Sequence, residues 1–173
     1  GKKVLGIDYF NLSADKKVLL VIGGSLGSRT INESIKNCLE NLSNKNIQLI
    51  WQTGKLFIET AQELIKQYKN ANFRVFDFIS RMDLAYAACD VIVSRAGAIA
   101  VSEICLVNKP AILIPSPNVA EDHQTKNAIA LFNHQAVMIV KDIDARQKLS
   151  EELMDLIENE EKQIQLKTNL AGL

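Results

Sequence analysis

The sequence has no excess of charge of either sign and no long apolar run. Its 20 Lys and Arg residues cancel its 20 Asp and Glu residues. The summed field of the chain therefore offers no attraction to a polyanion, and we expect no nucleic-acid partner. The longest apolar runs, such as 18–22 and 111–114, are far shorter than the ~20 residues that cross a bilayer. The sequence therefore predicts no membrane-spanning helix.

Paired cysteines and a secretion signal are also missing. Cys38, Cys89 and Cys105 are widely spaced, with no C-x-x-C pair for metal or redox chemistry. We interpret them as reduced thiols in the core. The start, Gly1-Lys2-Lys3-Val4, lacks the apolar stretch and small-residue cleavage site of a signal peptide. We therefore expect a cytoplasmic location.

What is present is enough apolar material for one core. Hydrophobic residues make up 47% of the 173 positions, which is ample for a domain of two or three layers. No Pro- or Gly-rich linker, internal repeat or low-complexity tract precedes a charged tail after Glu158. We therefore predict one domain over 1–173. The tail fits either a solvated helix or a strip that packs against protein outside this chain.

Six short apolar, β-branched runs predict strands, and the stretches between them have helical apolar spacing. The predicted strands are 17–23, 47–52, 73–76, 91–94, 111–114 and 136–140. The predicted helices are 31–42, 56–68, 82–89, 98–107, 123–133 and roughly 145–157. This alternation, with strands too apolar to be half-solvated, predicts an α/β fold: a doubly wound, six-stranded parallel sheet with helices on both faces.

Three of these strands run directly into unusual loops, at 23–28, 94–98 and 115–124. In open parallel sheets, ligands bind outside the carboxyl ends of the strands, where the loops and the positive helix N-termini gather. We therefore expect the three loops to converge on one binding site.

The first loop, Gly23-Gly24-Ser25-Leu26-Gly27-Ser28, precedes a helix, so its backbone N–H groups could hold a phosphate. The two common nucleotide motifs are absent. No lysine follows as in a P-loop, and Gln52 and Thr53 stand where a dinucleotide fingerprint has an acid. Glycines that merely allow a tight turn remain an equal alternative.

The second loop places Gly97 ahead of a helix that carries Glu103. A carboxylate there could accept two ribose hydroxyls, or it could be an ordinary solvated helix residue. Arg95 fits either a phosphate or a neighbouring acid as its partner.

In the third loop, Glu121 and Asp122 suit helix capping, whereas His123 and Gln124 are candidates for sugar hydroxyls. One histidine without a second His or Cys at ligand spacing makes a poor metal site. Without a nucleophile pattern it also makes a poor catalytic triad.

Read in order, the three motifs resemble the C-terminal half of the MurG family, the peptidoglycan N-acetylglucosaminyltransferases that convert lipid I to lipid II. The motifs are Gly23-Gly24-Ser25-x-Gly27, then Ser94-Arg95-x-Gly97-Ala98-x-x-x-Ser102-Glu103, then Pro115-x-Pro117 with Asp122-His123-Gln124-x-x-Asn127-Ala128. The resemblance covers the chain from about Val4 to about Ile157.

The resemblance implies a two-domain GT-B fold, of which this chain is the Rossmann-like half that holds the donor sugar nucleotide. It implies that Ser25 and the amides around Gly24 and Gly27 approach a diphosphate, and that the backbone of Ile79 pairs with uracil. The remaining implied contacts are ribose hydroxyls for Glu103, phosphate for the amides of Ala98 and Ile99, and GlcNAc for His123 and Gln124.

The sequence departs from the family pattern at three positions. Ala100 stands where many relatives have Thr, so a hydroxyl contact to the diphosphate is lost. His123 stands where many have Gln, and Leu26 where they often have Gln.

The implied reaction is the inverting transfer of GlcNAc from UDP-GlcNAc to lipid I. The resemblance implies no metal. The resemblance places three features on an N-terminal domain: the general base, the site for the lipid I acceptor and the contact with the membrane surface. The full protein is therefore expected at the cytoplasmic face of the membrane. This chain alone is expected to bind the donor without turnover. The start at Gly1, without an initiator Met, favours an excised domain. Two alternatives are a non-catalytic nucleotide-sugar subunit that needs a partner chain, and half of a UDP-GlcNAc 2-epimerase.

Overall fold

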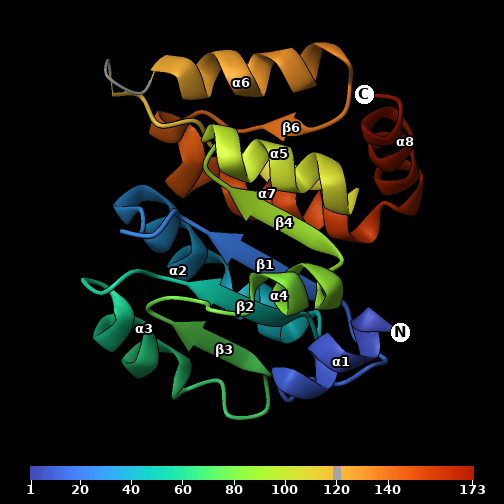
Figure 1. The fold of residues 1–173 in the computed structure, drawn as a ribbon. Coiled ribbons are helices and arrows are strands. Elements are labelled where there is room, and N and C mark those ends of the chain that lie inside the picture. The colour runs from blue at the N-terminus through green and yellow to red at the C-terminus, as the bar shows by residue number, and fades with distance from the viewer. Residues whose placement is uncertain (119–121) are drawn as a thin grey trace.

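The chain folds around one parallel sheet of six strands, shown in Figure 1. A computed structural model describes residues 1–118 and 122–173. The strand order is β3-β2-β1-β4-β5-β6, so the chain starts in the middle and winds outward in both directions, as predicted. The strands are β1 (Val18–Ile22), β2 (Gln48–Gln52), β3 (Phe73–Phe76), β4 (Val91–Ser94), β5 (Ala111–Leu113) and β6 (Met138–Ile139).

Helices cover both faces of the sheet. They are α1 (Lys2–Tyr9), α2 (Arg29–Asn44), α3 (Ile58–Ile65), α4 (Met82–Ala88), α5 (Ala98–Val107), α6 (Asp122–Asn133), α7 (Ala145–Glu158) and α8 (Glu160–Ala171), with a 3₁₀ turn at Asp142–Asp144. In the described part of the chain, none of them has both the length and the apolarity that a membrane crossing requires.

The two faces have separate hydrophobic cores because side chains alternate along each strand. Leu19 and Val21 of β1 pack in a core with α2 and α7, whereas Leu20 and Ile22 pack in a core with α1, α4, α5 and α6. Every residue of β1 is buried, which explains why its sequence is continuously apolar instead of alternating.

The charged tail forms α8, which packs against the chain's own sheet. Leu166 is buried in the core on the α2 face and Leu170 in the core on the α4 face. Asn159 caps the helix by accepting a hydrogen bond from the Lys162 amide at 3.0 Å. In Figure 1, α8 and both termini lie on the side opposite the carboxyl ends of the strands.

The helix α1 is not predicted by the sequence pattern. Only Gly6 and Ile7 of its eight residues are buried, so the helix has no repeating apolar stripe. It packs tightly on α4, since a Cβ on Gly6 would lie 2.4 Å from the carbonyl oxygen of Leu84. Glycine therefore sets the distance between these two helices.

Candidate functional site

A cleft of about 1200 Å³ opens at the carboxyl ends of the strands, and all three predicted loops contribute to its wall. The first loop contributes Gly24, Ser25 and Gly27. The second loop and α5 contribute Arg95, Ala98, Ile99 and Glu103, and the third segment contributes Gln124. Ser25, Glu103 and Gln124, which are far apart in the sequence, therefore face one space.

The first loop is held in a shape that depends on glycine. Gly24 and Gly27 have φ angles of +90° and +79°, and the Gly27 amide donates to the Gly24 carbonyl at 3.1 Å. A Cβ on Gly27 would lie 2.2 Å from the carbonyl oxygen of Thr53. The positive φ and the close approach to Thr53 therefore explain why glycine occupies position 27. At the exposed tip, the amides of Ser25 and Leu26 donate to no other described residue, so they remain available to an anion.

Gln52 joins this loop to the segment predicted to read a base. Its side chain is only 4% exposed. Its Oε1 accepts from the Ile79 amide at 2.8 Å, and its Nε2 donates to the Gly24 carbonyl at 3.1 Å. Among the sequence motifs, Gln52 stands out only because it is not an acid. A polar residue at the end of a fully buried strand is the signal that could have identified it.

Ile79 itself is buried and is not among the described residues that line the cleft. Since Gln52 takes its N–H, the carbonyl oxygen is the part of its peptide group left for a base. Its pairing with uracil stays a prediction.

The N-terminus of α5 opens into the cleft without a side-chain cap. Gly97 is the N-cap residue, and Ala98 and Ile99 follow it in the first turn, where helix amides lack an intrahelical partner. These amides and the helix dipole favour an anion at this position. The predicted phosphate contact is therefore compatible with the geometry.

Gln124 ties the third segment to the second loop. Its Oε1 accepts from the amides of Ser116 at 3.0 Å and Ala96 at 3.3 Å. Its Nε2 lies 4.0 Å from the position of a Cβ on Gly97. With its oxygen engaged, the side chain presents its NH₂ group near the start of α5, where it can donate to a ligand.

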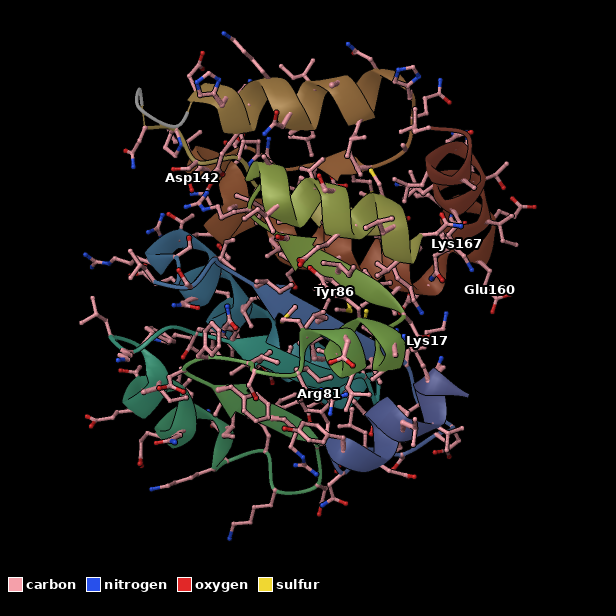
Figure 2. All side chains as sticks on the ribbon, viewed as in Figure 1. Lys17, Arg81, Tyr86, Asp142, Glu160 and Lys167 are labelled. Carbon is pink, nitrogen blue, oxygen red and sulfur yellow. The ribbon has the colours of Figure 1, made fainter. Side chains whose placement is uncertain are left out.

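Glu103 accepts a hydrogen bond from the hydroxyl of Tyr86 at 2.8 Å. Tyr86 also lines the cleft, and Figure 2 shows it between α4 and α5. Burial, followed by this hydrogen bond, raises the pKa of Tyr86, so the phenol keeps its proton and acts as a donor. No motif in the sequence points to Tyr86.

Arg95 pairs with an acid, which is one of the two alternatives left open by the sequence. Its Nη1 lies 2.5 Å from Asp142 Oδ1, and the side chains are only 15% and 16% exposed. The same nitrogen donates to the Ile114 carbonyl, and Asp142 also accepts from Thr30. Asp142 lies on the side of the molecule where the strands end (Figure 2). A contact from Arg95 to phosphate stays a prediction.

His123 is exposed on the first turn of α6 and is not among the described residues that line the cleft. Asp122 begins the same helix, and its Oδ2 lies 3.8 Å from Lys126 Nζ. Glu121, for which capping was expected, lies outside the described residues. The sugar contact of His123 stays a prediction.

Over residues 1–118 and 122–173, no three His, Cys, Asp or Glu side chains are grouped so that they could hold a metal ion. The polar lining of the described cleft combines backbone amides and hydroxyls with the charged side chains of Arg29, Arg95, Asp142 and Glu103. Arg95 pairs with Asp142, whereas Glu103 forms no ion pair with a described residue. Such a site suits an anion flanked by hydroxyl groups. That it works without a metal stays a prediction.

A doubly wound sheet with a cleft at the carboxyl ends of its strands defines a Rossmann-like α/β domain. Residues 18–172 match the family model described as the glycosyltransferase family 28 C-terminal domain. The chain belongs to this family.

Curated relatives match nearly the whole chain. A protein of Parabacteroides distasonis is 45% identical over 172 residues, and one of Cytophaga hutchinsonii is 51% identical over 162 residues. Both are named UDP-N-acetylglucosamine–N-acetylmuramyl-(pentapeptide) pyrophosphoryl-undecaprenol N-acetylglucosamine transferase. The alignments cover 99% and 94% of this chain but 47% and 43% of the relatives. The chain thus spans about half the length of the curated relatives it matches.

Solved structures agree with this assignment. The crystal structure of Acinetobacter baumannii MurG superposes with a TM-score of 0.81 at 27% identity, over 96% of this chain and 48% of that one. A UDP co-structure of S. aureus MnaA superposes with a TM-score of 0.66 at 14% identity, over 94% of this chain and 42% of that one. This likeness shows the fold alone. The predicted fold class, the Rossmann-like half of a GT-B glycosyltransferase, is confirmed.

Proposed function

We propose that this chain is the donor-binding domain of an inverting N-acetylglucosaminyltransferase that moves GlcNAc from UDP-GlcNAc to lipid I. The observation that carries the proposal is the meeting of three loops in one cleft, where open amides and the Glu103 carboxylate face the same space. The names of the relatives, which are 45–51% identical, support both the donor and the acceptor.

The amides at the tip of the first loop and at the start of α5 hold the diphosphate. Negative charge grows on the leaving diphosphate during transfer, and donors fixed in advance stabilise that charge most effectively. Gln124 Nε2 donates to the sugar or the phosphate beside Gly97. No metal takes part in this step.

Glu103 holds the ribose. A carboxylate has about four acceptor positions, and Tyr86 occupies one of them. The others suffice for the two adjacent hydroxyls of a ribose. The Ile79 carbonyl accepts from uracil.

The rest of the reaction belongs to the half of the relatives that this chain does not span. The general base that activates the lipid I hydroxyl lies there, as do the acceptor site and the contact with the cytoplasmic face of the membrane. This chain by itself therefore binds UDP-GlcNAc and does not turn it over.

Calorimetry on this chain tests the proposal. We expect binding heat with UDP and with UDP-GlcNAc, and the replacement Glu103→Ala should weaken UDP binding by about 1–3 kcal/mol because the ribose hydroxyls lose their acceptor. Glu161→Ala, on the exposed surface of α8, is the matched control and should bind UDP normally. Equal or tighter binding of NAD or ATP would reject the assignment, and an unchanged affinity in Glu103→Ala would remove Glu103 from the site.

A further inference from the structure

Tyr86 and Glu103 form a contact that the function proposed above does not explain. The tyrosine lies on α4 and the glutamate on α5, and the 2.8 Å hydrogen bond between them connects the two helices at the wall of the cleft. Tyr86 is only 4% exposed, whereas Glu103 is half-buried. The fixed partner is therefore the tyrosine, and the carboxylate is the part that reaches toward the cleft.

A neutral donor orients a carboxylate without consuming its charge. No salt bridge joins Glu103 to a described residue, so its negative charge is not neutralised by a nearby Lys or Arg. Tyr86 bonds to Oε2 and leaves Oε1 open. Glutamate side chains lose considerable rotamer freedom when they are ordered, and a bond made before the ligand arrives removes part of that cost from binding.

The properties of Tyr86 suit this task. Its backbone belongs to a helix packed closely on α1, and a tyrosine has only two side-chain torsions to fix. Its hydroxyl stays protonated because burial raises its pKa. It therefore remains a hydrogen-bond donor at neutral pH.

We propose that Tyr86 is a positioning residue which, by holding the Glu103 carboxylate, sets the preference of the cleft for a ribose over a 2′-deoxyribose. The inference rests on the proposed function, since it assumes that Glu103 accepts from the ribose. A carboxylate held in one orientation can meet both adjacent hydroxyls at once, whereas a free one meets them only in part of its rotamers. Removing the tyrosine hydroxyl therefore reduces the benefit of the second hydroxyl.

The experiment compares UDP with 2′-deoxy-UDP by calorimetry on the unaltered chain and on Tyr86→Phe. The unaltered chain should prefer UDP. Tyr86→Phe should bind UDP about five- to tenfold more weakly but 2′-deoxy-UDP less than about twofold more weakly, so the preference shrinks. Tyr68→Phe is the control: it removes a hydroxyl outside the cleft, on a ring that packs against Phe73, and should change neither affinity.

A merely structural role for Tyr86 would lower the affinities for UDP and 2′-deoxy-UDP equally, and that result overturns the inference. The inference also fails if Tyr86→Phe leaves the ratio of the two affinities unchanged for any other reason. If the unaltered chain binds no UDP, the proposed function fails as well, whereas binding with an unchanged ratio removes only the role of Tyr86.

A second measurement uses Glu103→Ala as background. Without a carboxylate to orient, adding Tyr86→Phe should change UDP affinity by less than about twofold. Additive losses would contradict the inference. If Tyr86→Phe is less stable than the unaltered chain, all affinities are compared at a lower temperature at which circular dichroism shows both chains folded; an unchanged preference there would count against the inference.

Discussion

Single thiols show how burial alone sets chemical behaviour in this chain. Burial raises the pKa of the Cys89 thiol to about 12 and that of Cys38 to about 11, from an ordinary value of 9.0. Cys105 is partly exposed, and its pKa is also raised by burial. Because the thiolate is the reactive form, the two buried cysteines are unreactive at neutral pH.

We predict that at pH 8 a maleimide labels Cys105 first. The thiolate fraction of Cys38 and Cys89 grows only as the pH rises toward their raised pKa values, so both should react at least about tenfold more slowly in the folded chain. Mass spectrometry of the labelled peptides gives the three rates. In denaturant all three should react alike, and a folded-state rate for Cys89 equal to that of Cys105 would contradict the prediction.

At the scale of elements, the turn between β1 and α2 depends on residue size. Gly27 has a positive φ and lies against the backbone of Thr53, whereas Gly24 has a positive φ with open space where a Cβ would be. The two glycines therefore separate the cost of backbone conformation from the cost of steric overlap.

We predict that Gly27→Ala lowers the free energy of unfolding by at least about 2 kcal/mol and Gly24→Ala by about 1 kcal/mol. Both alanines adopt an unfavourable φ, but only the first also meets the Thr53 carbonyl. Denaturant unfolding of the two variants gives the comparison, with Gly24→Ala as the matched control. Equal losses would show that the close contact with Thr53 is relieved at no cost.

For the molecule as a whole, α8 joins the two cores. It lies at the end of the sheet away from the cleft (Figure 1) and places Leu166 in one core and Leu170 in the other. Gln163 adds hydrogen bonds to the carbonyls of Leu156 and Ile157 at the end of α7. The tail is therefore part of the packed domain, although its sequence is rich in charge.

We predict that Leu166→Ala and Leu170→Ala each lower the free energy of unfolding by about 2–4 kcal/mol, because each leaves a cavity at the junction of α8 with a core. Ile164, which is 63% exposed on the same helix, is the control, and its replacement by alanine should stay within about 0.5 kcal/mol. Thermal or denaturant unfolding measures all three. A loss in Ile164→Ala as large as in the leucine variants would contradict the prediction, because it would show that the burial of Leu166 and Leu170 does not set the stability.

Much of this architecture is readable along the chain. Strands such as β1 are buried on both faces, so their residues must be apolar at every position, and that pattern is visible locally. Parallel strands bring their carboxyl ends to one edge, which is why Ser25, Glu103 and Gln124 were expected to meet. The eight-residue α1, with two buried positions, carries too little pattern to be predicted.

The side chains that complete the cleft could not be identified in this way. Gln52 acts through Ile79, Tyr86 through Glu103, and Asp142 through Arg95, pairs separated by 27, 17 and 47 residues. A hydrogen bond or ion pair depends on distance and direction between two groups, and neither is encoded in the neighbourhood of either residue. The burial of whole strands thus determines the sheet and the edge at which a ligand binds, whereas side-chain contacts between α4 and α5, and between the 3₁₀ turn and the residue after β4, decide which polar groups are held there.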